Sequence, residues 1–177
     1  MRRRHIHIHI HIAIAIAIAM LAAPAGASAQ AGGSRFPTVL LSAKTSGGRF
    51  QGSFVIRRFR LRPTGIAAFG RLNGTLRDRR YPTTQRVRNR SFSFAVAAVR
   101  VPGATSCARL AIVFAARTAP IVGLAATFGP RTLVLRPRRG TGPSTRELLC
   151  GASTAVATNA PPQVTVHLLN ALRLQYA

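Results

Sequence analysis

The sequence predicts a mainly β protein: an antiparallel β-sandwich or partly open barrel of about seven strands with a small C-terminal helical part. Two observations lead to this fold class. From Phe36 to Leu135, short runs rich in Val, Ile, Phe and Thr alternate with polar residues, which is typical of strands that bury one face. After Gly140 the apolar residues change to a helical spacing.

The alternating segments are separated by clusters of Gly, Pro and Arg. Between Phe50 and Ile56 the even-numbered positions are apolar or glycine and the odd-numbered ones are mostly polar, so one face belongs to the core and the other to solvent. The predicted strands are Thr38–Lys44, Gly48–Leu61, Gly65–Arg77, Gln85–Val101, Ala108–Ala115, Ile121–Thr127 and Thr132–Arg136.

Two local signals help to place the strand ends. Asn73-Gly74 has the composition of a tight hairpin turn, but glycine inside a strand also marks a bulge, and we favour the bulge. The prolines, Pro120 among them, fall between the predicted strands, where a missing backbone N–H costs least.

The C-terminal part is expected to be helical. Pro143 opens a short helix that ends near Gly151, and the Ala/Thr-rich stretch Ala152–Ala160 is a linker or a frayed helix. After Pro162, apolar residues at helical spacing predict a last helix, although Val164–Val166 could instead form a strand.

The N-terminus has the features of a secretory signal peptide: a basic start, an apolar stretch from Ile6 to Ala23 and a small-x-small cleavage site at Ala27–Ala29. We predict a signal peptide at residues 1–29 and a single β-rich secreted domain at residues 30–177. The protein would then be secreted or associated with the cell envelope. The alternative is a leader retained as a membrane anchor, because the apolar stretch approaches the roughly 20 residues of a spanning helix.

Cys107 and Cys150 are the only cysteines. An even number of cysteines in an exported chain is most simply a disulfide, here Cys107–Cys150. The alternative is a pair of buried thiols. Their spacing fits no zinc motif.

The amino-acid composition argues against most classes of enzyme. The chain has 26 Lys and Arg against 2 Asp and Glu, a net charge of +24, and its only side-chain carboxylates are Asp78 and Glu147. It therefore cannot supply a carboxylate acid and base pair from neighbouring positions or a carboxylate cage for Mg²⁺. His167 is the one histidine after the leader, and no nucleophile elbow or phosphate-binding loop is present. We predict a non-enzymatic protein with no catalytic residue, cofactor or metal.

The arginines suggest contacts with anions. Arg58, Arg60 and Arg62 share one face of a predicted strand and would present planar donors suited to phosphates. We expect the arginine clusters to bind anionic cell-envelope polymers or lipid headgroups, and nucleic acid only non-specifically through counterion release. The predicted anion-binding residues are Arg57, Arg58, Arg60, Arg62, Arg79, Arg80, Arg136, Arg138 and Arg139.

Two alternatives to anion binding remain open. The charges could serve solubility alone. Alternatively, a small-ligand carrier or an enzyme could use an apolar pocket in the β-core. The sequence predicts no oligomeric state.

Two segments carry a family resemblance: the Gly-x-Phe-x-Gly run Gly48–Gly52 and the Leu-Leu-Cys run Leu148–Cys150. In order and spacing, the chain from about Gly47 to Ala155 resembles an uncharacterised family of small secreted proteins of high-GC bacteria. The resemblance implies leucine-alternating strands, a Gly-rich turn and a Leu-Leu-Cys helix. Members are sometimes labelled ABC transporter substrate-binding proteins, but this chain lacks the alternating strands and helices that two α/β lobes require.

Overall fold

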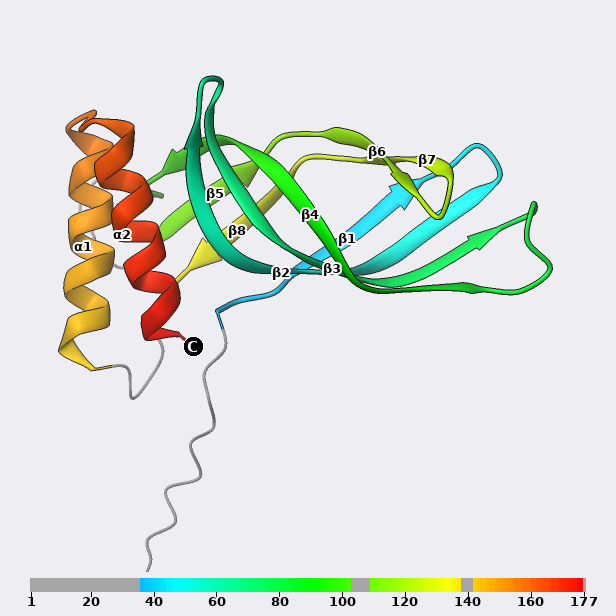
Figure 1. Ribbon diagram of the computed structural model, residues 1–177. Coiled ribbons are helices and arrows are strands. Elements are labelled where there is room, and N and C mark those ends of the chain that lie inside the picture. Colours follow the sequence, from blue (N-terminus) through cyan, green and yellow to red (C-terminus); the bar gives the residue numbers. More distant parts are fainter. Residues whose placement is uncertain (1–35, 103–108, 138–141, 177) are drawn as a thin grey trace, which may run out of the picture. The chain divides into compact units, whose positions relative to one another are not determined.

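The computed structural model describes residues 36–102, 109–137 and 142–176. Eight antiparallel strands form one sheet that curls into a half-barrel, and two helices follow at one end of it (Figure 1). The predicted fold class is confirmed, with the partly open barrel as the form observed. The elements are β1 (Val39–Lys44), β2 (Gly48–Arg62), β3 (Gly65–Asp78), β4 (Gln85–Arg100), β5 (Leu110–Phe114), β6 (Arg117–Ile121), β7 (Leu124–Phe128), β8 (Arg131–Leu135), α1 (Pro143–Ala157) and α2 (Pro162–Gln175).

The chain from β5 to β8 forms a long bent hairpin that reaches both edges of the β1–β4 meander. At its base β5 pairs with β4, and β8 pairs with β5. Beyond the bend β7 pairs with β1, and β6 pairs with β7. The resulting strand order is β6-β7-β1-β2-β3-β4-β5-β8. Because one hairpin pairs with both the first and the last strand of the meander, the sheet curls.

The predicted strand Ile121–Thr127 is wrong at its start. Ile121 ends β6, and a turn at Val122 and Gly123 separates it from β7. Both turn residues have a positive φ, 48° at Val122 and 78° at Gly123. A positive φ is common for glycine but unusual for valine. Pro120 lies inside β6 and not between strands, which is tolerated because β6 is an edge strand.

Aromatic rings fill the inside of the half-barrel. Phe54, Phe92, Phe94 and Phe128 form a cluster of ring pairs with centroids 5.1–6.4 Å apart. The strand glycines make room for such rings, since a Cβ on Gly52 would lie 2.6 Å from the Phe50 ring. The Gly-x-Phe-x-Gly pattern is therefore a packing feature.

Asn73-Gly74 forms no hairpin turn, and a bulge occurs at this level of the β3–β4 pairing, but its extra residue lies in β4, opposite Asn73, and not in β3 as predicted. The pairing of β3 with β4 shifts register between Leu72 and Gly74, while both residues stay within β3. The Asn89 backbone N–H donates to Asn73 Oδ1 (2.8 Å), and Asn89 adopts a positive φ of 48°. The side chain of Asn73 thus replaces part of the interrupted ladder.

The helical part is longer than predicted. α1 passes through Gly151 and ends at Ala157, so of the two alternatives for Ala152–Ala160 the helix is observed up to Ala157 and the linker is excluded there. A Cβ on Gly151 would lie 3.6 Å from a methyl carbon of Leu168, which places this glycine where the two helices pack. α2 contains Val164–Val166 and excludes the strand alternative.

The described residues belong to a compact unit that spans Gly32–Ala177. No helix among them is long and apolar enough to cross a membrane. The predicted signal peptide lies outside the described residues and stays a prediction. Cys150 is half-buried on α1, whereas Cys107 lies outside the described residues, so their disulfide also stays a prediction.

Candidate anion-binding groove

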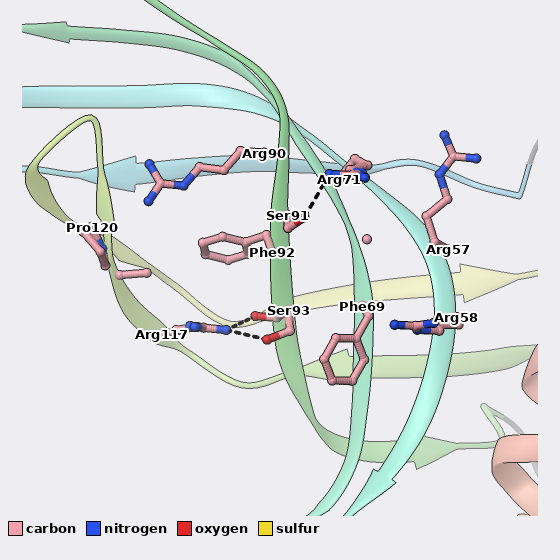
Figure 2. Close-up of a pocket in the computed structure, with 12 residues that line it drawn as sticks. Arg57, Arg58, Phe69, Arg71, Arg90, Ser91, Phe92, Ser93, Arg117 and Pro120 are labelled. Atoms are coloured by element: carbon pink, nitrogen blue, oxygen red, sulfur yellow. Dashed lines mark hydrogen bonds between the residues drawn. The ribbon is translucent and has the colours of Figure 1, made fainter.

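A groove of about 570 Å³ runs over β2, β3 and β4 and is bounded by β6. Arginines from all four strands surround it, with serine and phenylalanine side chains between them. In Figure 2, Ser91 and Phe69 lie in the middle of the groove, with Arg57, Arg58 and Arg71 on one side and Arg90 and Arg117 on the other. The five arginines are Arg57, Arg58, Arg71, Arg90 and Arg117.

Strand register brings these side chains together. Phe69 on β3 is the cross-strand partner of Arg58 on β2 and of Ser93 on β4. The β2–β3 register shifts between Ile56 and Arg58, which leaves Arg57 as an extra residue. A bulge of this kind re-aims side chains, and the consecutive residues Arg57 and Arg58 both line the groove.

Three guanidinium groups lie close to the ring of Phe69. The Cζ atoms of Arg58, Arg60 and Arg62 lie 5.9, 5.8 and 4.7 Å from the ring centroid. Cation–π attraction of about 0.5–1 kcal/mol per exposed pair offsets part of their mutual repulsion. The three arginines share one face of β2, as their alternate spacing predicts, and the aromatic ring at the centre of this cluster was not predicted.

Two of the groove arginines are held by neutral acceptors. Arg71 Nη1 donates to the Asn89 carbonyl oxygen (2.9 Å) and to Ser91 Oγ (2.8 Å). Arg117 Nη1 donates to Ser93 Oγ (2.8 Å) and to the Ser93 carbonyl oxygen, and its Cζ lies 4.8 Å from the centroid of Phe92. These contacts position the guanidinium groups and leave their positive charge uncompensated.

The Asp78 carboxylate is paired outside the groove. In the part of the chain that the structure describes, the single ion pair within 4.0 Å joins Arg80 and Asp78. The Thr45 hydroxyl donates to Asp78 and is the main reason that the pKa of this carboxyl lies below its usual range, against the opposing effect of burial. The Arg80 backbone N–H adds a second hydrogen bond to Asp78 (3.1 Å). Asp78 is therefore an ionised acceptor that connects the turn at Thr45 with the turn at Arg80.

Three other predicted anion-binding residues, Arg79, Arg80 and Arg136, do not line the groove. Arg79 lines a separate hollow beside Asp78, and Arg80 contacts Asp78 and Ser46. Arg136 follows β8, and its carbonyl oxygen accepts a hydrogen bond from the Tyr176 hydroxyl (2.8 Å). Arg138 and Arg139 lie outside the described residues.

Three groove arginines, Arg71, Arg90 and Arg117, are not among the predicted anion-binding residues, and Arg71 and Arg117 also stand apart from the arginine clusters in the sequence. Arg71 follows Phe69 by two residues, so strand parity could have placed it on the same face. Arg117 reaches the groove only because the long hairpin carries β6 back toward β4. No local pattern could have predicted that contact.

Within the described residues, no cluster of three His, Cys, Asp or Glu side chains could hold a metal ion, and His167 is exposed on α2. Comparison with protein-family models, curated proteins and solved structures found no match to the chain. The resemblance to small secreted bacterial proteins therefore stays a prediction.

Proposed function

We propose that this protein is a non-enzymatic binding module of the cell envelope or the extracellular space that holds anionic polymers in its arginine-lined groove. One observation carries the proposal: five guanidinium groups surround a single hollow whose lining residues include no carboxylate. Guanidinium forks match phosphate and sulfate oxygens in a bidentate manner, so an anion would supply the missing counter-charge.

The length of the charged surface favours a polymer over a single small anion. A neighbouring hollow of about 280 Å³ shares Ser93 and Arg117 with the groove and extends it to Arg62 and Thr64. Alternate residues on a strand are separated by roughly 6–7 Å, so Arg58, Arg60 and Arg62 span several anionic groups of an extended chain. Binding would be driven largely by release of counterions.

A carrier that uses an apolar pocket in the β-core is the other candidate. Phe50, Phe54, Phe94 and Phe128 are at most 1% exposed, and their rings occupy the inside of the half-barrel. No observation favours this second function, and we propose the groove as the binding site.

Retention on surfaces of known charge tests the proposal. The full chain is mixed with polyphosphate-coupled beads, anionic liposomes and neutral liposomes, each at low and at high salt. We expect retention on the beads at low salt and release at high salt. Binding to anionic liposomes alone would identify lipid headgroups as the ligand and contradict a polymer. No retention on any surface at low salt would overturn the proposal.

A further inference from the structure

The groove continues past Arg57 and Arg71 into a second hollow of about 490 Å³, which both residues also line. In Figure 2 these two arginines lie on the same side of the groove. The second hollow brings together β2, β3 and β4 with Arg173 of α2. Its volume lies within the range of roughly 300–1,000 Å³ that is usual for small-molecule sites.

Arg173 places a third positive charge in this hollow. Its side chain is half-buried, and its Nε atom is buried without a hydrogen-bond partner among the described residues. A buried N–H group of a cation that has no hydrogen-bond acceptor lowers the stability of the fold. An anion bound between Arg57, Arg71 and Arg173 would supply the counter-charge for this half-buried cation.

Neutral hydrogen-bonding side chains distinguish the second hollow from the rest of the groove. Thr38, Asn73 and Asn89 line it together with the arginines. Amides and hydroxyls both donate and accept, as sugar hydroxyls do, whereas a guanidinium only donates. The Asn73 amide is fixed in place because its Oδ1 accepts the Asn89 backbone N–H.

From this combination we infer that the polymer is an anionic polysaccharide, an inference that rests on the proposed function. Arg57, Arg71 and Arg173 bind a phosphate or sulfate ester of one sugar unit, and Asn89 and Thr38 bind its hydroxyls. The following units extend along the arginine-lined groove. A polyanion without hydroxyls offers acceptors alone, so it can use the donor groups of Asn89 and Thr38 but not their acceptor atoms.

The test compares two polyanions by calorimetric titration of the full chain. The probes are a chondroitin sulfate oligosaccharide, which carries hydroxyls and anionic groups, and inorganic polyphosphate, which carries anionic groups alone. Asn89→Gly removes the amide at a position whose φ of 48° suits glycine. Thr38→Val removes an exposed hydroxyl at nearly constant shape. Each variant should weaken chondroitin sulfate binding roughly fivefold, the loss of one hydrogen bond, and should weaken polyphosphate binding less, because polyphosphate cannot donate to these side chains.

Two charge variants complete the design. Arg173→Met keeps the aliphatic packing and should weaken the binding of both polyanions, while Arg146→Met on the exposed face of α1 should weaken neither. Equal effects of Asn89→Gly and Thr38→Val on both probes, or no effect on either, would overturn the polysaccharide inference and leave the proposed function standing. Failure of the unaltered protein to bind either probe at low salt would overturn both.

Discussion

The Asn170 side chain of α2 forms two hydrogen bonds with the backbone of Phe59 in β2. The Phe59 N–H donates to Oδ1 (2.8 Å), and Nδ2 donates to the Phe59 carbonyl oxygen (3.0 Å). β1 pairs with β2 only as far as Phe54, so the amide takes the place of a neighbouring strand beyond that point. The contact fixes α2 against the segment of β2 that presents Arg58 and Arg60.

Replacing this amide should destabilise the protein. Asn170→Leu leaves the Phe59 N–H and carbonyl groups without their partner in a partly buried position, and we expect a loss of about 2–4 kcal/mol in the free energy of unfolding. Urea denaturation measures the change. Gln163→Leu, at an exposed position of the same helix, is the control and should shift the midpoint little. Equal midpoints for the two variants would show that the Asn170 contact contributes nothing.

Acid stability should depend on Asp78. Because the Thr45 hydroxyl holds the pKa of Asp78 below its usual value of 3.8, the ionised carboxylate stabilises the fold above that value. This contribution is lost as the pH falls through the lower pKa of the folded state. Asp78→Asn should therefore be less stable at pH 7 and should lose less stability on acidification between pH 5 and pH 2.

Denaturation midpoints across this pH range test the assignment. Glu147 is the only other side-chain carboxylate and is exposed on α1, so Glu147→Gln should keep the pH dependence of the unaltered protein. Parallel curves for Asp78→Asn and the unaltered protein would show that the Asp78 contacts do not govern acid stability.

Substitution of a strand glycine tests whether the sheet leaves room for a side chain there. A Cβ on Gly70 would overlap the Val55 carbonyl oxygen and lie 2.8 Å from the Phe54 ring, so Gly70→Ala should cost about 3 kcal/mol or more and lower the melting temperature. At Gly129 a Cβ meets no heavy atom of the described residues within 4 Å, which makes Gly129→Ala the matched control. A melting temperature for Gly70→Ala equal to that of the control would contradict this packing.

Strand parity was enough to predict most of the sheet. β1 to β4 lie close to their predicted ranges because each buries one face and the alternation is long. β6 was missed because Pro120 suggests a break and because Val122 occupies a turn conformation that its side chain disfavours. Gly151 suggested a helix end, but it is a point of contact between α1 and α2. In each case tertiary packing overrides the local preference.

The sequence predicts only those parts of the candidate site whose residues lie close together on one strand. The shared face of Arg58, Arg60 and Arg62 follows from alternate spacing on one strand. The approach of Arg117 to Ser93 depends on the bent hairpin, and Arg173 depends on the docking of α2. These are long-range relationships, and no sequence period encodes them.

The central claim is that the groove, and not the net charge, binds polyanions. The most direct test measures polyphosphate affinity against salt concentration for two variants of equal charge. One carries Arg→Gln at Arg58, Arg71 and Arg117 in the groove, and the other carries Arg→Gln at Arg79, Arg136 and Arg146 outside it.

We predict weaker binding for the groove variant, with a plot of log affinity against log salt that is shallower by about 2, since each lost phosphate contact removes roughly 0.7 of slope. The second variant should keep most of the affinity and slope of the unaltered protein. Equal losses in the two variants would contradict the claim and assign the binding to net charge alone.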